Sequence, residues 1–147
     1  MHRNRGSSPR IEICFLVHAT EDLDKVLQAV TNIFPEDHSK DIDYEKSFLL
    51  GYHKNPIIMV KTSIEDKLSA SSFLRRVLTE LEPDDKILLS AGIRSQIDSR
   101  QNFYLRLDKQ EAFLGRLKLC TIDPIHIKAR LKALQIPLEE LESLVKS

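Results

Sequence analysis

The sequence predicts an α+β protein whose mainly antiparallel sheet packs against helices. Several segments alternate apolar and polar residues with the period of two that is typical of strands. Other segments repeat apolar residues with the 3.6-residue period of a helix. Several strand pairs are joined by links too short for the helical crossover that parallel strands need, which favours antiparallel pairing.

The N-terminal part of the chain predicts a strand followed by a helix. Residues 10–18 alternate, and residues 21–34 carry a helical apolar stripe that ends at Pro35. The Thr20 hydroxyl is placed to cap this helix by accepting a backbone N–H. The acidic residues that follow Thr20 are favoured there by the helix dipole.

The middle of the chain predicts two strands and two helices. The strands, at 41–50 and 57–62, lie on either side of a turn at 51–56. The first helix is expected over 64–81, where Ser63 and Asp66 have the spacing of an approximate capping box. A weaker helix is expected over 84–97, because Gly92 inside it costs about 1 kcal/mol.

The C-terminal third predicts a strand-rich region that ends in a helix. Alternation indicates strands at 103–107, 116–119 and 125–132. Apolar residues at helical spacing then predict a short amphipathic helix over 137–146.

Length and composition predict a single domain. The 147 residues, 41% hydrophobic and 30% charged, are enough to bury a core without disulfides or metals. We expect a flexible leader at 1–9, one domain over 10–132 and a helical tail at 133–147. No apolar run approaches the ~20 residues of a membrane span, so no membrane partner is expected. The two cysteines, Cys14 and Cys120, favour reduced core thiols in a cytoplasmic protein.

Charge is unevenly distributed along a chain whose formal net charge is zero. Residues 21–50 hold eight acidic and three basic residues, whereas residues 100–132 hold eight basic and three acidic ones. Such asymmetry is compatible with an anionic partner, although many folded proteins have charged faces without one.

The last predicted strand has a basic face. Strand alternation puts His126, Lys128, Arg130 and Lys132 on one side, at steps of about 6.8 Å. Phosphates along a nucleic-acid strand recur at a comparable spacing. We expect this face to be joined by Arg106, Arg116 and Lys118, with the Tyr104 ring available for stacking. The alternative interpretation, which the pattern leaves open, is the solvated side of a half-buried sheet.

Known catalytic signatures are absent from the sequence. There is no phosphate-binding glycine-rich loop, no nucleophile elbow and no histidine or cysteine spacing typical of zinc. We therefore expect no enzymatic activity, no cofactor and no metal.

Four motifs resemble those of an archaeal family of predicted RNA-binding proteins that are described as exosome-associated subunits. The first is the His-Ala-Thr-Glu-Asp run at 18–22, and the second is the turn at 51–57. The third is Tyr-Leu-Arg-Leu-Asp-Lys-Gln at 104–110, and the fourth is Asp-Pro-Ile-His-Ile-Lys at 123–128. Together they occur in the family's order and span nearly the whole expected domain.

The resemblance implies a fold like that of the large-subunit ribosomal protein that binds 5S RNA. The family has also been likened to double-stranded-RNA-binding domains, and its description implies exosome subunits as partners. Lys54 stands where the family's turn is expected to have glycine, which predicts a turn without positive φ at this position. In the third motif a simple turn needs only Asp108 and Gly115, so Lys109 and Gln110 are candidates for RNA contact.

The sequence leaves three functional hypotheses. The first is a non-catalytic RNA-binding protein that contacts phosphates, in single-stranded or structured RNA, through the basic C-terminal strands. The second is a protein-interaction module that docks on an RNA-processing assembly through its apolar tail helix. The third is a small enzyme whose active site carries no recognisable signature.

Overall fold

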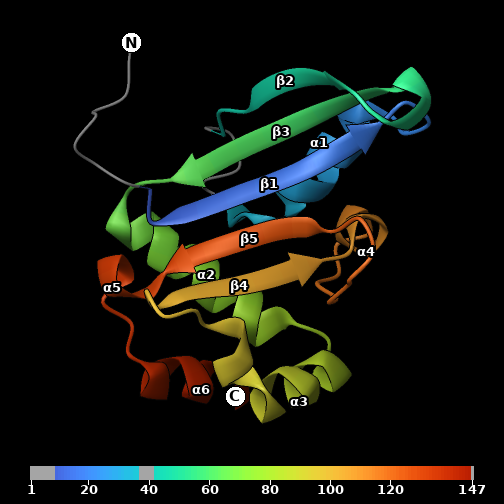
Figure 1. Cartoon of the computed structure of the whole chain (residues 1–147). Helices are drawn as coiled ribbons and strands as arrows, with labels where there is room; N and C mark the ends of the chain where they lie inside the picture. The colour runs from blue at the N-terminus through green and yellow to red at the C-terminus, as the bar shows by residue number, and fades with distance from the viewer. Residues whose placement is uncertain (1–8, 37–41, 147) are drawn as a thin grey trace.

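The computed structural model describes residues 9–36 and 42–146, and it confirms the predicted α+β class. Its centre is a five-stranded antiparallel sheet in the order β2-β3-β1-β5-β4 (Figure 1). The strands are β1 (Ile11–His18), β2 (Glu45–Leu50), β3 (Pro56–Ile64), β4 (Asn102–Leu107) and β5 (Ile125–Arg130). The α-helices are α1 (Leu23–Ile33), α2 (Lys67–Glu80), α3 (Pro83–Ala91), α4 (Lys109–Phe113), α5 (Leu131–Leu134) and α6 (Leu138–Lys146). Two 3-10 turns are η2 (Tyr52–Lys54) and η3 (Ile93–Gln96).

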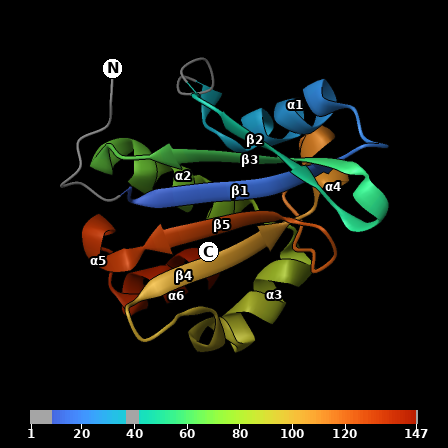
Figure 2. The ribbon, with the colours of Figure 1, turned by 45° about the horizontal axis from the view of Figure 1, so that its top comes forward.

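The sheet has one covered face and one open face. In β1 the inward residues, from Ile11 to Val17 in alternation, are buried, whereas the outward ones between them are half-buried. Figure 2 looks onto the open face, with α1, α2 and α6 behind the strands. Alternation in the sequence therefore identified which side of β1 forms the core, and the outward side remains accessible to a partner.

The two long helices are joined where α1 ends. The rings of Phe34 and Phe73 pack with centroids 5.0 Å apart. Arg76 of α2 donates from Nη1 to the carbonyl oxygens of Ile33 and Phe34, each at 2.6 Å. These carbonyls belong to the end of α1, where helix carbonyls need partners from outside the helix. Arg76 therefore caps α1 from a neighbouring helix.

Both helix starts differ from the sequence prediction. Asp22, and not Thr20, caps α1: its carboxylate accepts from the backbone N–H groups of Asp24 and Lys25. Thr20 is exposed in the turn before it. Asp66 caps α2 by accepting from Ser69 N at 2.9 Å, while Ser63 lies inside β3. In both cases the cap is an aspartate nearer the helix than the residue the pattern indicated.

The turn between β2 and β3 contains two left-handed residues. His53 and Lys54 have φ angles of 57° and 61°. The prediction that Lys54 requires a turn without positive φ is therefore wrong. A Cβ at Gly51 would collide with Cδ1 of Ile57, so a larger residue there would force that side chain to move. The first residue of the predicted strand at 41–50, and residues 1–8 of the predicted leader, lie outside the described residues.

The C-terminal half corrects three predicted elements. The predicted helix over 84–97 is shorter, since α3 ends at Ala91 and Gly92 separates it from η3. Residues 116–119 form only isolated bridges to Leu81 and Leu107, not a strand. The strand predicted over 125–132 ends at Arg130, and the chain turns directly into α5. Lys132 is therefore on a helix and off the basic strand face.

The tail helix α6 is present as predicted, and its apolar side is used within the chain. Leu141 and Val145 are fully buried in the common core, where α6 packs against α2 and α3. The tail helix therefore uses Leu141 and Val145 for packing within the chain. The longest helix among the described residues has 14 residues, so none of them could cross a membrane.

Candidate nucleic-acid interface

One row of side chains crosses the open face of the sheet. Strand register places Arg106 of β4 opposite His126 of β5, His126 opposite Cys14 of β1, and Cys14 opposite Lys61 of β3. Neighbouring strands lie about 4.8 Å apart, so the row spans about 15 Å at the backbone. We call these four residues the basic row. Beyond Lys61 the row ends at a carboxylate, because Glu45 of β2 lies opposite Lys61.

A second row runs beside the first and contains an acidic residue. Here Tyr104 lies opposite Lys128, and Lys128 lies opposite Glu12. Glu12 Oε2 is 3.9 Å from Lys128 Nζ and 3.7 Å from Arg130 Nη2. The last strand carries no carboxylate on this side, but the strand next to it supplies one. Lys128 and Arg130 are therefore partly neutralised before any ligand arrives.

The two rows line an open hollow of about 1240 Å³. Its lining includes Arg106, His126, Lys128, Lys61 and Tyr104, together with the acidic residues Glu12, Asp43, Glu45 and Glu65. A broad, shallow hollow of this kind suits an extended ligand that lies across several strands. The arrangement offers positive charge and hydrogen-bond donors without a deep enclosed pocket.

Tyr104 is held by an internal hydrogen bond. Its hydroxyl donates to Asp98 Oδ2 at 2.8 Å, and this bond to a carboxylate raises the pKa of Tyr104. The same carboxylate accepts from the backbone N–H groups of Asn102 and Arg100, both at 2.9 Å. The bond from the Asn102 N–H, then the one from Tyr104, are the main reasons why the pKa of Asp98 falls to about 2. The Tyr104 ring, expected to stack on bases, is therefore fixed and half-buried at the rim of the hollow.

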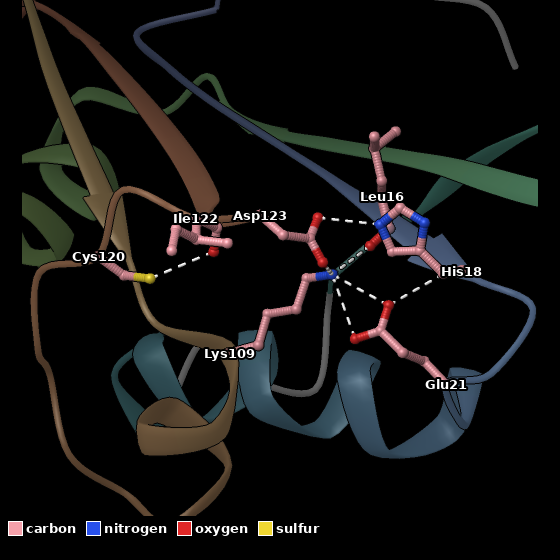
Figure 3. A network of polar contacts seen from close by, with 7 residues as sticks. All are labelled: Leu16, His18, Glu21, Lys109, Cys120, Ile122 and Asp123. Atoms are coloured by element: carbon pink, nitrogen blue, oxygen red, sulfur yellow. Dashed lines mark hydrogen bonds and ion pairs between the residues drawn. The ribbon is translucent and has the colours of Figure 1, made fainter. Parts of the chain in front are cut away.

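Lys109 is the centre of a polar network at one end of the sheet (Figure 3). Its side chain is only 9% exposed. Nζ donates to the Leu16 carbonyl oxygen at 2.5 Å, to Asp123 Oδ2 at 2.8 Å and to Glu21 Oε1 at 3.1 Å. An ammonium has three donors, and all three are used. These contacts give Lys109 an internal role that ties together β1, the residues just before α1 and the 120–124 loop.

His18 and Asp123 complete this network. His18 Nε2 lies 3.1 Å from Asp123 Oδ1, and its backbone N–H donates to Glu21 Oε1 at 2.9 Å. Partial burial acts to raise the pKa of Asp123, but hydrogen bonds from Lys109 and His18 outweigh it and lower that pKa. His18, Glu21 and Asp123 bring metal-ligand atoms within 4.8 Å of one another. Lys109 already supplies the positive charge there, so a metal ion would have to displace its ammonium.

The four motifs singled out in the sequence meet at this end of the sheet. The end of β1, the start of β3, the end of β4 and the start of β5 all lie there, as the antiparallel register requires (Figure 1). The first motif supplies His18 and Glu21, the third supplies Lys109 and the fourth supplies Asp123. Much of the sequence resemblance therefore reflects one structural network.

The remaining predicted contact residues are dispersed. Gln110 is exposed on α4, and Lys118 is exposed in the link before β5. Arg116 is exposed but pairs with Glu111 at 2.7 Å, a hydrogen bond that raises the pKa of the guanidinium. Of the nine residues predicted to contact RNA, only Arg106, His126, Lys128 and Arg130 lie on the open sheet face. Arg116 and Lys118 were expected there because the link at 116–119 was interpreted as a strand.

Sequence reasoning missed two residues of the open face. Lys61 was overlooked because it interrupts an apolar strand, and that interruption was the available signal for an outward-facing residue. Glu12 was overlooked because its position next to β5 depends on strand order. The cysteines also differ from expectation: both are free and half-buried, with Cys14 on the open face and Cys120 in a loop. Burial raises the pKa of the Cys14 thiol, which disfavours its reactive thiolate.

Comparisons with known proteins identify relatives along nearly the whole chain. An RNA-binding protein from Pyrococcus abyssi is 35% identical over 138 residues, covering 92% of this chain and 90% of the relative. An uncharacterized protein from Methanocaldococcus jannaschii is 33% identical over 118 residues, covering 78% of each chain.

Solved structures show the same fold. A DUF54 protein from Sulfolobus solfataricus has a TM-score of 0.75 at 26% identity, covering 92% of this chain and 96% of that one. A DUF54 protein from Methanothermobacter thermautotrophicus has a TM-score of 0.65 at 24% identity, with coverages of 92% and 96%, and it supports the fold alone. A family model described as RNA binding matches residues 10–131. The chain therefore belongs to this RNA-binding family.

Proposed function

We propose that the chain is a non-catalytic RNA-binding protein that contacts phosphates through the open face of its sheet. The observation that carries this proposal is the basic row, in which Arg106, His126 and Lys61 come from three different strands. Their shared face is open to solvent, and the family description supplies the class of ligand.

The length of the basic row sets how many phosphates it reaches. Phosphates of one RNA strand recur at roughly 7 Å, which is also the spacing of alternate residues along a β-strand. A row that spans about 15 Å therefore reaches two to three phosphates. Arginine and lysine neutralise phosphates directly, and His126 adds a donor between them. Contacts of this kind position the ligand and do not read its sequence.

A double substitution tests the basic row. Arg106→Ala with Lys61→Ala should weaken binding to RNA and should lower the magnitude of the salt slope by about 0.7 per lost phosphate contact on single strands. Arg94→Ala with Lys132→Ala is the matched control, because it removes the same two residue types from exposed positions on η3 and α5.

The measurement is affinity by fluorescence anisotropy at several salt concentrations, with circular dichroism to verify folding. We expect the control variant to bind as the wild type does. Equal losses of RNA affinity from both variants would mean that any exposed positive charge attracts RNA and that the basic row is not the site. A wild-type protein that binds neither single-stranded nor duplex RNA at low salt would overturn the proposed function itself.

The absence of catalysis is part of the proposal. Phosphodiester cleavage commonly uses carboxylates that hold metal ions. In the described residues the one cluster with such geometry contains Lys109 as its counter-charge. Labelled RNA incubated with the protein and magnesium or manganese should therefore stay intact. Cleavage that disappears on Asp123→Asn would identify a nuclease.

Association with exosome subunits is a further part of the proposal, supported by the sequence resemblance. Purified exosome subunits should then retain this protein on a column, and retention should survive treatment with ribonuclease if contact is direct. Retention that ribonuclease abolishes would indicate that RNA alone bridges the two.

A further inference from the structure

The β2–β3 hairpin carries the most exposed aromatic side chain described in this chain. Tyr52 is 86% exposed and Phe48 is 78% exposed, and Leu50 between them is 73% exposed. Exposed large apolar groups gathered on one segment mark interaction sites more often than single ones do. Each of the other four strands has buried residues, whereas every residue of β2 is exposed.

The charge of the hairpin indicates what kind of partner it fits. The hairpin, residues 45–64, contains Lys46, Lys54 and Lys61, together with His53, and a single acidic residue, Glu45, at the start of β2. A second copy of the chain would bring these like charges together if the two β2 edges paired. A polyanion would be attracted to them instead, and an anion that also carries flat rings would satisfy the exposed aromatic groups.

The turn holds its aromatic groups in a defined arrangement. Gly51 N donates to Asn55 O at 2.7 Å, and Lys54 N donates to Gly51 O at 3.0 Å. The Tyr52 and His53 rings meet edge to face, with centroids 4.6 Å apart. His53 and Lys54 keep left-handed backbone angles, which persist where surrounding structure fixes them. The tip is therefore a preformed loop and places one face of Tyr52 toward solvent.

The hairpin also lies close to the proposed RNA face. Ile57, directly after the turn, is paired with His18 at the end of β1 where the four motifs meet. Figures 1 and 2 both show the hairpin tip projecting beyond this end of the sheet. An RNA strand that leaves the basic row at Lys61 can therefore reach the tip by running along β3 toward its start.

We propose that Tyr52 at this hairpin tip stacks on an unpaired base of RNA, with the neighbouring Lys54 contacting an adjacent phosphate. The inference rests on the proposed function for the identity of the ligand, but it assigns a separate contact region and a preference for unpaired nucleotides. Stacking on an aromatic ring tolerates any base, because every base presents a π-face. Inside a duplex each base pair is already stacked on both faces, so free base faces remain only at the two duplex ends.

A tryptophan substitution reports stacking directly, because the natural chain contains no tryptophan. In Tyr52→Trp, a short oligouridine should quench the fluorescence, whereas a long RNA duplex, in which nearly all base faces are stacked, should quench it far less. The control is Ile87→Trp, at a position on α3 that is 69% exposed and remote from the hairpin (Figure 1). Its fluorescence should stay unchanged with both RNAs.

Affinity measurements complete the test. Tyr52→Ala should weaken oligouridine binding on the order of tenfold and leave duplex binding unchanged, while Tyr52→Phe should bind as the wild type does. If oligouridine binds but neither quenches Tyr52→Trp nor loses affinity to Tyr52→Ala, the hairpin inference is overturned and the proposed function stands. If Tyr52→Ala changes only the self-association of the protein, measured by sedimentation, the hairpin inference is overturned and the hairpin is a protein contact. Failure of the wild type to bind any RNA would overturn both.

Discussion

The ammonium of Lys109 lies 2.8 Å from Asp123 Oδ2 and 3.1 Å from Glu21 Oε1, although these three residues come from separate parts of the chain. Lys109 occupies the position in the third motif from which sequence reasoning predicted an RNA contact. Its contacts make it a structural link between β1, the start of α1 and the loop before β5. The consequence is that its substitution should act first on stability.

Lys109→Met is expected to lower the free energy of unfolding by about 2 kcal/mol. Methionine keeps the length of the side chain but leaves two carboxylates and the Leu16 carbonyl without their shared donor. Urea unfolding followed by circular dichroism measures the change. Gln110→Ala, at an exposed neighbouring position, should stay within about 0.5 kcal/mol of the wild type. If Lys109→Met keeps the stability of the wild type but loses RNA affinity, Lys109 contacts RNA directly.

The cap of α1 gives a second prediction. Asp22→Ala should cost about 1 kcal/mol of stability, because two backbone N–H groups lose the carboxylate that accepts from them. Thr20→Ala, two residues earlier, should change stability by less than about 0.5 kcal/mol. Asp22→Asn should restore most of the loss, since asparagine caps about as well as aspartate. A larger loss for Thr20→Ala than for Asp22→Ala in thermal melts would contradict the cap assignment.

Asp98 predicts a pH dependence of stability. Its pKa of about 2 in the folded protein lies below its ordinary value of 3.8, so the folded state favours the ionised form. The contribution is therefore fully present above about pH 4 and is lost as pH falls through about 2. Asp98→Asn should melt at a lower temperature than the wild type at neutral pH, and the difference should shrink progressively below pH 4. A difference that is constant from pH 7 to pH 2 would show that the carboxylate charge is not responsible.

Substitution of Glu12 is expected to strengthen RNA binding. Glu12→Gln removes the carboxylate that pairs with Lys128 and Arg130, so both cations become available to phosphates. RNA binding should strengthen severalfold at low salt, and the advantage should fade as salt screens the charges. Glu139→Gln on α6, exposed and away from the sheet face, removes the same charge and should have a smaller effect. Equal gains from the two variants would indicate net charge alone.

Reversing the charges of Lys128 and Arg130 together is expected to do more than weaken RNA binding. Lys128→Glu with Arg130→Glu places two carboxylates beside Glu12, and like charges opposite one another destabilise a sheet. Lower thermal stability should therefore accompany the loss of affinity. Combining the pair with Glu12→Lys should recover stability. Recovery in thermal melts distinguishes this electrostatic effect from loss of core packing.

The sequence by itself determined the features that depend on local periodicity. Alternation identified β1, β4 and most of β5, and it separated Ile125 and Ile127, which are buried, from His126, which is exposed. Helical spacing identified α1, α2 and α6. These predictions succeed because a side chain's direction in a strand or a helix follows from its position along that element.

Only the tertiary structure decided which residues meet across elements. Leu117 and Leu119 alternate like a strand, but they form single bridges to Leu81 and Leu107 instead of a continuous ladder. Lys132 continues the alternation of β5, yet the chain has already turned into α5. Glu12 and Lys61 join the proposed interface because β1 and β3 lie next to β5 and β1 in the sheet. The burial of Lys109 likewise depends on Glu21 and Asp123 arriving from distant segments, and no local pattern encodes such an encounter between charges.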